Sequence, residues 1–278
     1  MTQPPVTPAP SLSLDDGNTI PQLGFGLYKV PAADAARLSR DAIAIGYRHL
    51  DTAALYANEE GVGEAVRSAE VPRDELFVAS KVWMDDNGYD STLRAFDASM
   101  QRLGLATLDL YMIHWPVPST DLYVETWRAL VRLQEEGRVQ SIGVANFHAH
   151  HLERIIGETG VAPVVNQVEL HPWLPQEELR AFDEAHVIRT EAWSPLARGR
   201  VLGTPLLAEI ADKHGRTPAQ VVLRWHLELG NVVIPKASSP ERLRENLDVF
   251  DFTLDDEDMA AIATLESGER TGRDPDFD

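Results

Sequence analysis

Residues 76–116 read LFVASKVWMDDNGYDSTLRAFDASMQRLGLATLDLYMIHWP and contain one complete strand–helix–strand pattern. The short apolar runs Leu76–Lys81 and Leu108–His114 are typical of buried strands. Between them lies one apolar helix face, whose residues recur at steps of three and four: Leu93, Phe96, Met100 and Leu103. Gly104 then marks the helix end. The stretch therefore predicts two neighbouring parallel strands joined by a helix.

The same unit recurs along the chain. Eight strands are predicted: Phe25–Val30, Arg48–Thr52, Leu76–Lys81, Leu108–His114, Gln140–Asn146, Val164–Glu169, Val187–Trp193 and Asn231–Pro235. Helical patterns lie between them: Ala33–Ile45, Glu60–Ser68, Thr92–Leu103, Tyr123–Glu136, His151–Glu158 and Gln176–Ala185. Eight such units without a break in composition predict one closed (β/α)8 TIM barrel, an α/β fold.

The first expected strand also bears on an alternative fold. An open doubly wound sheet would need a glycine-rich phosphate loop after that strand. Gly24-Phe-Gly26 comes near, but no third glycine follows and no helix begins there. The barrel is therefore the preferred prediction and the open sheet the second.

Additional secondary-structure elements are predicted at both ends of the chain. The runs Ser11–Leu14 and Thr19–Leu23, separated by a glycine turn, predict an N-terminal β-hairpin. Extra helices are predicted near the C-terminus: Leu206–His214, Pro218–Leu229 and Asp255–Glu266. The expected division is a flexible N-terminal tail over residues 1–10 and a single barrel domain over residues 11–278. Residues 267–278 are expected to form a C-terminal tail near the barrel mouth.

Composition excludes several classes of function. The net charge of −19 argues against binding to nucleic acid or to anionic membrane, since both need a basic surface. The sequence contains no run of about 18 apolar residues, so no membrane span is predicted. The first ten residues do not resemble a secretory signal. Cysteine is absent, which removes disulfides and thiolate chemistry. We expect a cytoplasmic monomer without a metal site.

The C-terminal ends of barrel strands carry the reactive groups of such folds. Asp51 ends the second expected strand and Tyr56 follows in its loop. Lys81 ends the third strand and His114 ends the fourth. An acid, a phenol, an ammonium and an imidazole are thereby expected around one pocket.

These four groups suit carbonyl reduction. A phenol is a weak acid at neutral pH, and a neighbouring ammonium lowers its pKa while a carboxylate holds that ammonium. Tyr56 would then donate a proton to an oxygen that gains negative charge. A neutral His114 would donate a hydrogen bond to the same oxygen. Taken singly, each residue has an ordinary structural explanation, and only the combination favours catalysis.

The sequence closely resembles the aldo-keto reductases at these residues. The resemblance is carried in family order by Gly46–Glu59 (GYRHLDTAALYANE), Leu108–Pro116 (LDLYMIHWP), Asn166–Pro172 (NQVELHP), Ile234–Arg242 (IPKASSPER) and Glu245–Phe250 (ENLDVF). Similarity extends from about Leu14 to Asp255. Within the family the chain is most similar to the bacterial branch that includes 2,5-diketo-D-gluconate reductases.

The resemblance implies NADPH-dependent reduction of aldehydes, ketones or α-dicarbonyls, with Tyr56 as proton donor, Lys81 and Asp51 as its tuning pair, and His114 orienting the substrate. It implies these cofactor-binding residues: Asn146, Gln167, Trp193, Ser194, Leu196, Lys236, Ser238, Arg242, Glu245 and Asn246. It implies a substrate pocket lined by Tyr28, Trp83, His114 and Trp115, with Phe277 as a further candidate.

Two departures from the family pattern concern the cofactor. Ala145 precedes Asn146 where the family usually has serine, which removes one hydrogen bond to the nicotinamide. Ala237 replaces a second serine beside Lys236. NADPH is therefore the expected cofactor and NADH a weaker alternative.

Two other functions remain open at this point. One is a Schiff-base enzyme on a barrel, with Lys81 as the nucleophile. The other is a regulatory module that binds NADPH with little turnover. Neither explains the complete set of residues as well as a carbonyl reductase does.

Overall fold

A closed ring of parallel strands confirms the predicted barrel. The computed structural model describes residues 9–277, and its eight-stranded sheet has the order β10-β9-β8-β7-β6-β5-β4-β3. The strands are β3 (Phe25–Gly26), β4 (His49–Asp51), β5 (Phe77–Val82), β6 (Leu108–Ile113), β7 (Val139–Ala145), β8 (Val165–Glu169), β9 (Arg189–Trp193) and β10 (Val232–Val233). The edges meet where the N–H of Gly24 donates to the Val233 carbonyl at 2.9 Å.

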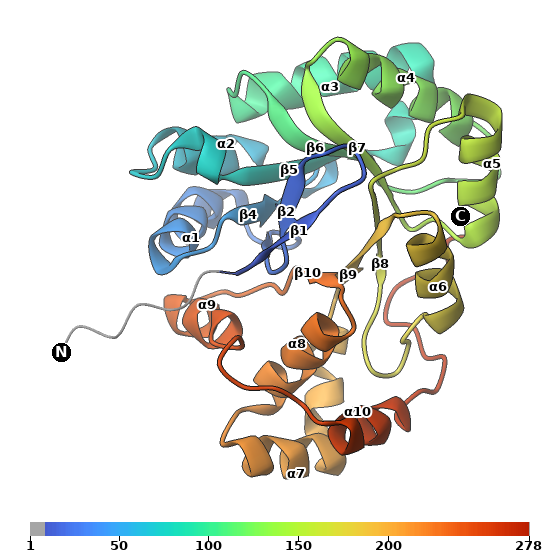
Figure 1. The fold of residues 1–278 in the computed structure, drawn as a ribbon. Coiled ribbons are helices and arrows are strands. Elements are labelled where there is room, and N and C mark those ends of the chain that lie inside the picture. The colour runs from blue at the N-terminus through green and yellow to red at the C-terminus, as the bar shows by residue number, and fades with distance from the viewer. Residues whose placement is uncertain (1–8, 278) are drawn as a thin grey trace.

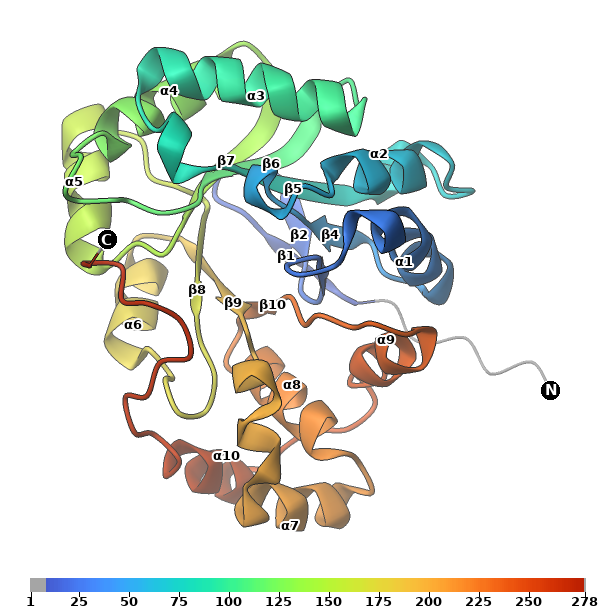
Figure 2. The ribbon, with the colours of Figure 1, turned by 180° about the vertical axis from the view of Figure 1, so that it is seen from behind.

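Helices surround this ring (Figures 1 and 2). They are α1 (Ala32–Ile45), α2 (Glu59–Arg67), α3 (Tyr89–Leu103), α4 (Tyr123–Glu135), α5 (Ala149–Thr159), α6 (Glu177–Ala185), α7 (Pro205–His214), α8 (Pro218–Glu228), α9 (Pro240–Leu247) and α10 (Asp256–Ala263). Short 3₁₀ helices are η1 (Ala54–Tyr56), η2 (Arg73–Glu75), η3 (Met84–Asp86), η4 (Ala197–Gly199) and η5 (Val201–Gly203). Within residues 9–277, no helix combines the length and apolar character needed to cross a bilayer.

Several element boundaries differ from the prediction. Strand β3 ends at Gly26 rather than at residue 30, because Lys29 adopts a left-handed backbone (φ 59°) in the turn that follows. Strand β9 begins at Arg189 rather than at Val187, whose φ of 58° is incompatible with a strand. In both cases the predicted strand extended into a turn, because the turn contains a β-branched apolar residue, Val30 or Val187.

Helix α9 was not among the predicted helices. Its sequence is short and mostly polar, and its two apolar residues, Leu243 and Leu247, are too few to mark a helix by periodicity. Its start nevertheless carries a local signal: the Ser239 hydroxyl caps the helix, and Pro240 occupies the first position. That signal would have located the helix.

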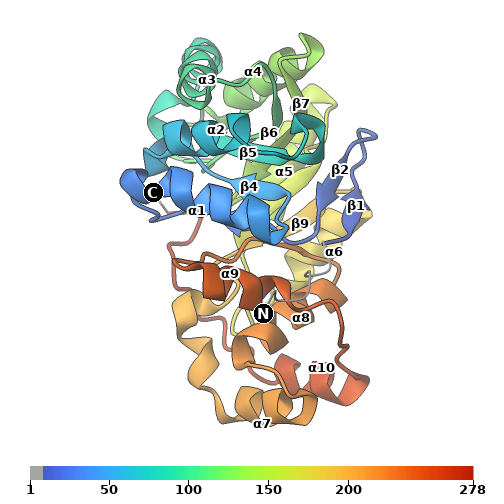
Figure 3. The same cartoon turned by 90° about the vertical axis from the view of Figure 1, so that its left-hand side faces the viewer.

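The interior of the barrel has an apolar floor and a polar upper layer. The floor is a cluster of buried residues: Leu14, Ile20, Phe77, Ala79, Leu110, Met112, Val164, Val165 and Val232. The hairpin of β1 (Ser11–Ser13) and β2 (Thr19–Pro21) contributes Ile20 to this floor and lies at one edge of the molecule in the side view of Figure 3. On β5, side chains alternate between faces, so Lys81 shares the inner face with Ala79 one layer higher.

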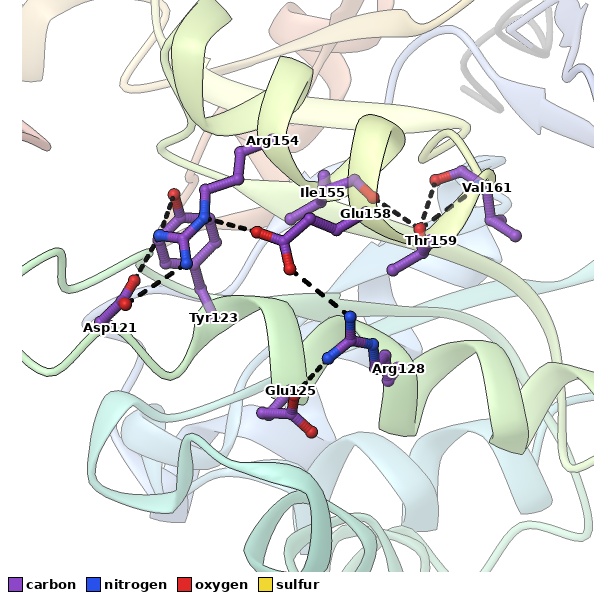
Figure 4. A network of polar contacts seen from close by, with 9 residues as sticks. All are labelled: Asp121, Tyr123, Glu125, Arg128, Arg154, Ile155, Glu158, Thr159 and Val161. Atoms are coloured by element: carbon purple, nitrogen blue, oxygen red, sulfur yellow. Dashed lines mark hydrogen bonds and ion pairs between the residues drawn. The ribbon is translucent and has the colours of Figure 1, made fainter.

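A polar network connects the loop after β6 to the outer helices (Figure 4). Arg154 on α5 pairs with Asp121 in that loop and with Glu158 one helical turn further on, the latter at 2.9 Å. Glu158 also contacts Arg128 on α4 at 3.5 Å. The side chains are partly exposed, so the network adds little stability. Through these contacts the loop after β6 lies against α5.

The two ends of the chain differ in how far the structure describes them. Residues 1–8 of the predicted N-terminal tail lie outside the described residues, and the Pro10 carbonyl accepts a hydrogen bond from the N–H of Gln22 at 2.8 Å. The C-terminal segment leaves α10 and runs back toward α5 (Figures 1 and 2). The division into tails and one barrel domain stays a prediction.

Candidate active site

Lys81 and Asp51 form a buried ion pair at the ends of β5 and β4. The Nζ of Lys81 lies 2.7 Å from each carboxylate oxygen of Asp51 and donates to the Thr52 carbonyl at 3.0 Å. Lys81 is 0% exposed and Asp51 is 1% exposed. A buried charge is tolerated when it is paired and hydrogen-bonded, and these contacts meet both conditions. The pair predicted from the two strand ends is thus present.

Tyr56 lies against this pair. Its ring belongs to η1, and the Nζ of Lys81 is 5.3 Å from the ring centroid. The turn is held by Asn58, which accepts from the Thr52 hydroxyl at 2.6 Å and donates to the Leu27 carbonyl at 3.0 Å. The sequence analysis had not singled out Asn58. It joins the loops after β3 and β4.

The acidity of Tyr56 differs from the expectation. Burial raises the pKa of this phenol well above its usual value, and the negative charge of Asp51 raises it further. We had expected Lys81 to lower that pKa, but its ammonium is already paired with Asp51. Tyr56 consequently keeps its proton at neutral pH, which is the form that a proton donor requires.

His114 is uncharged in this environment. It follows β6, and its ring makes edge contacts with Tyr56 at 5.6 Å and with Trp83 at 5.1 Å between centroids. Burial lowers the pKa of His114 far below its usual value, and the charges of Lys81 and Arg273 lower it further. Its Nδ1 has no hydrogen-bond partner within the described residues. A neutral, incompletely bonded imidazole therefore lies beside the phenol.

Aromatic side chains surround these groups. Tyr28 lies 5.1 Å from Tyr56 between ring centroids, and Trp83 contacts His114. Trp115 is covered by the guanidinium of Arg273 at 4.3 Å, a cation–π contact. Phe277 is 72% exposed, and its part in the pocket stays a prediction.

Asn146 and Trp193 are connected to His114 by hydrogen bonds. The Asn146 amide donates to the His114 carbonyl at 2.8 Å and accepts from the Trp193 indole N–H at 2.9 Å. Asn146 has a φ of 64°, a left-handed conformation that asparagine tolerates better than most residues. The ends of β6, β7 and β9 are thereby held together around one polar chain.

Gln167 connects Asp51 to a carboxyl group that the sequence analysis missed. Its Nε2 donates to Asp51 Oδ2 at 2.9 Å and to Glu191 Oε2 at 2.7 Å. Glu191 lies two residues before Trp193 on β9 and is fully buried. The sequence feature that could have identified Glu191 is its acidic side chain on the inner face of the predicted strand Val187–Trp193, where apolar residues are expected.

A second group of predicted cofactor residues lies around α9. Lys236 and Arg242 are exposed, and neither forms an ion pair within residues 9–277, although acidic residues outnumber basic ones in this chain. Lys236 donates to the Lys29 carbonyl at 2.9 Å. Glu245 accepts from the Thr217 hydroxyl at 2.7 Å, while Asn246 is buried. Ser238, Lys236 and Arg242 thus flank the N-terminus of a helix, where anions are favoured.

Ser194 and Leu196 lie where the chain turns out of the barrel after β9. Ser194 has a φ of 48°, and its carbonyl accepts from the N–H of Ala197 at 2.8 Å. The carbonyl of Leu196 accepts from the N–H of Gly199 at 2.7 Å. The turn is tightly hydrogen-bonded, and the assigned roles of both residues stay predictions.

The C-terminal segment crosses the ends of β8 and β9. Glu169 accepts from the N–H of Thr271 at 2.6 Å and of Gly272 at 3.0 Å. A Cβ on Gly272 would lie 2.5 Å from a ring carbon of Trp193, so the backbone passes directly against that ring. These contacts place Thr271 and Gly272 against Glu169 and Trp193, while the assignment of residues 267–278 as a tail near the barrel mouth stays a prediction.

Three histidines of the loop and helix α5 face the end of this segment. His148 lies 3.2 Å from Asp274, and His150 and His151 lie 3.3 and 3.5 Å from Asp276. The His151 Nδ1 accepts from the His148 N–H, so in its neutral form His151 carries its proton on Nε2. That proton faces Asp276 and leaves this nitrogen without a free lone pair for a metal. One of these contacts is a hydrogen bond, between His148 Nε2 and Asp274 Oδ1, and it connects the segment to the loop before α5.

Known proteins are similar to this chain over nearly its whole length. The model of the aldo/keto reductase family matches residues 22–267. An aldo-keto reductase of Mycolicibacterium smegmatis is 53% identical over 96% of this chain and 97% of its own length. Methylglyoxal reductase DkgA of Escherichia coli is 49% identical over 95% of this chain and 96% of its own.

A solved structure is also similar to this chain. The structure of a Gox0644 mutant in complex with NADPH superposes with a TM-score of 0.94 at 51% identity, covering 98% of this chain and 99% of that one. The matches confirm the resemblance to the aldo-keto reductases and to their bacterial 2,5-diketo-D-gluconate reductase branch. The chain belongs to the aldo/keto reductase family.

Proposed function

We propose that this protein reduces small aldehydes, ketones or α-dicarbonyls with NADPH, using Tyr56 as the proton donor. The observation that carries the proposal is the position of the partly buried Tyr56 between the Lys81–Asp51 pair and the neutral His114. Family membership and the similarity to a methylglyoxal reductase support the reaction type. The aromatic side chains of Tyr28, Trp83 and Trp115 suit small substrates with few charges.

The residues of this chain fit NADPH in two places. Around α9, Lys236 and Arg242 are exposed cations, and an ammonium with a planar guanidinium suits a phosphate dianion. At the barrel mouth, the Trp193 ring offers a face for stacking. The structure of the Gox0644 mutant with NADPH supports this choice of cofactor.

The remaining cofactor contacts follow the family assignment. We assign Asn146 and Gln167 to the nicotinamide carboxamide and the turn at Ser194 and Leu196 to the pyrophosphate. Ser238 would join Lys236 and Arg242 at the 2′-phosphate, and the adenine is assigned to a pair on α9, Glu245 and Asn246. NADH remains the weaker alternative, because Ala145 and Ala237 each remove a hydroxyl from these contacts.

NADPH supplies the hydride that reaches the carbonyl carbon. The protein's part is to hold the carbonyl oxygen near Tyr56 and His114 and to move one proton. His114 donates a hydrogen bond to that oxygen as negative charge develops on it. The Tyr56 O–H bond then breaks as the proton joins the oxygen. The Lys81 ammonium lies 5.3 Å from the Tyr56 ring centroid, but its pairing with Asp51 leaves little of its charge to stabilise the resulting phenolate.

The geometry disfavours Lys81 as a Schiff-base nucleophile. An amine attacks a carbonyl through its lone pair, whereas Lys81 is buried and donates to Asp51 and to the Thr52 carbonyl. Borohydride would trap a keto substrate on Lys81 if that chemistry occurred. We expect no such label.

The test is a carbonyl screen followed by the loss of reduced-nicotinamide absorbance. Methylglyoxal, a simple aldehyde and a simple ketone are each assayed with NADPH and with NADH. We expect turnover with NADPH and slower turnover with NADH. If NADPH binds but no carbonyl compound is reduced, the protein is a cofactor-binding module and the proposal is wrong. A monomeric state and a cytoplasmic location stay predictions.

A further inference from the structure

A second carboxyl group lies next to the Lys81–Asp51 pair and has no part in the reaction described above. Glu191 is buried on β9, and one of its oxygens, Oε2, accepts from Gln167 at 2.7 Å. The other oxygen, Oε1, has no hydrogen-bond partner in residues 9–277. An ionised carboxylate in such a place would leave an acceptor unsatisfied, which is costly.

A ring nitrogen faces that free oxygen. Nε2 of His49 lies 3.6 Å from Glu191 Oε1, and it too is buried without a hydrogen-bond partner. His49 is uncharged, because burial lowers its pKa to about 4 despite the opposing charge of Asp51. Two incompletely bonded groups therefore face one another. When neutral His49 carries its proton on Nδ1, its Nε2 is an acceptor that needs a proton on Glu191 Oε1, whereas a proton on Nε2 would suit an ionised Glu191.

Charge balance also favours a proton at this position. The described groups near Glu191 are Asp51 and His49 from β4, Tyr56 from η1, Lys81 from β5 and Gln167 from β8, while the neighbouring β10 contributes Val232. The single ammonium is already paired with both oxygens of Asp51. Burial raises the pKa of Glu191, and the charge of Asp51 raises it further.

We propose that Glu191 is a positioning residue that works as an uncharged carboxylic acid, donating to His49 and accepting from Gln167. The two acceptors, Asp51 and Glu191, then hold the Gln167 nitrogen from both sides. The amide oxygen of Gln167 is left for a donor from outside the barrel. Glu191 thereby sets which end of that amide is presented to a bound nicotinamide.

Ionisation of Glu191 would also affect the proton donor. A second negative charge beside Asp51 raises the pKa of Tyr56 further and makes its phenol a weaker acid. Keeping Glu191 neutral limits the charge beside Tyr56 to one carboxylate and one ammonium. The effect on catalysis rests on the proposed carbonyl reduction, whereas the protonation of Glu191 does not.

Two substitutions separate the neutral acid from the alternatives. Glu191→Gln keeps a carbonyl toward Gln167 and places an N–H donor toward His49, so it mimics the protonated acid. Glu191→Leu keeps a similar volume and removes both polar groups. We expect Glu191→Gln to stay within about twofold of the wild-type kcat at neutral pH, and Glu191→Leu to lose roughly tenfold or more through a misplaced amide.

The pH dependence provides a readout that a purely structural role would not change. From neutral to mildly alkaline pH, the wild type should lose kcat/KM relative to Glu191→Gln, because only the wild type can ionise at residue 191. Superimposable pH profiles, or a Glu191→Gln variant as slow as Glu191→Leu at every pH, would overturn the proposal.

Thermal unfolding of the cofactor-free protein tests protonation without catalysis. A carboxyl whose pKa is raised by folding loses its contribution to stability as pH rises through the folded-state pKa. The melting temperature of Glu191→Gln should therefore rise relative to that of the wild type as pH is raised. A pH-independent difference would show that Glu191 is ionised and contradict the proposal. Absence of wild-type NADPH turnover would contradict only the proposed function.

Discussion

Both carboxylate oxygens of Asp51 lie 2.7 Å from the Nζ of Lys81, and neither side chain reaches solvent. Removing one member of a buried pair leaves the other charge without compensation, which is more damaging than losing an exposed pair. Stability and chemistry are therefore coupled at this point. The same contact that holds Lys81 beside Tyr56 also keeps the barrel interior electrically neutral.

Asp51→Asn should destabilise the protein and slow reduction. A neutral amide cannot balance the Lys81 charge, so we expect the free energy of unfolding to fall by about 3 kcal/mol. Chemical denaturation followed by circular dichroism measures this change. Asp97→Asn is the matched control, because Asp97 pairs with Arg138 at the surface. The control should change by no more than about 0.5 kcal/mol. Equal losses of unfolding free energy in Asp51→Asn and Asp97→Asn would contradict the distinction between the buried and the exposed ion pair.

Tyr56→Phe should abolish carbonyl reduction and leave NADPH binding nearly unchanged. The substitution removes only the hydroxyl that carries the proton, and the ring keeps its contacts with Tyr28 and His114. Turnover is measured by NADPH absorbance, and binding by fluorescence titration. Tyr89→Phe, on the partly exposed start of α3, serves as control and should retain activity. Loss of binding together with turnover would mean that Tyr56 is structural.

Much of this site was predictable because parallel strands end on the same face of a barrel. Asp51, Lys81 and His114 could be assigned to strand ends from local patterns alone, and the fold then placed them together. The environment of Tyr56 could not be predicted in the same way. Its pKa depends on burial and on which partner neutralises Lys81, and both are properties of the assembled barrel.

The residues that sequence reasoning missed depend on contacts distant in the chain. Glu191 acquires its role from Gln167 and His49, which lie on other strands. Glu169 stood inside a recognised motif, but its partners Thr271 and Gly272 are in the C-terminal segment. An acidic residue in a strand gives no local sign of which distant group it meets. Only tertiary structure supplies that information.

Lys236→Ala and Arg242→Ala should each weaken NADPH binding much more than NADH binding. Only NADPH carries the 2′-phosphate, and a charge-assisted hydrogen bond to it contributes about 1.5–3 kcal/mol. The dissociation constant for NADPH should rise roughly ten- to a hundredfold. Arg244→Ala, on the same helix, is the matched control and should have little effect on either cofactor. Equal weakening of NADPH and NADH would remove Lys236 and Arg242 from the phosphate site.

Gly272→Ala should disturb the C-terminal segment where it crosses Trp193. The added Cβ would lie 2.5 Å from a ring carbon of Trp193 and 3.1 Å from Glu169 Oε2, so the segment or the ring has to move. Overpacking of this kind costs about 1–3 kcal/mol. Because Trp193 is proposed to stack on the nicotinamide, we expect a lower melting temperature and a several-fold weaker NADPH affinity.

The control for Gly272→Ala is the same substitution where space is available. A Cβ on Gly157 in α5 would meet no atom within 4 Å, and an alanine inside a helix is favoured over glycine by about 0.5–1 kcal/mol. Gly157→Ala should therefore raise the melting temperature slightly and leave NADPH affinity unchanged. If Gly272→Ala behaves like Gly157→Ala, the segment does not press on Trp193. Weakened NADPH binding in Gly272→Ala alone would instead identify the C-terminal segment as one wall of the cofactor site.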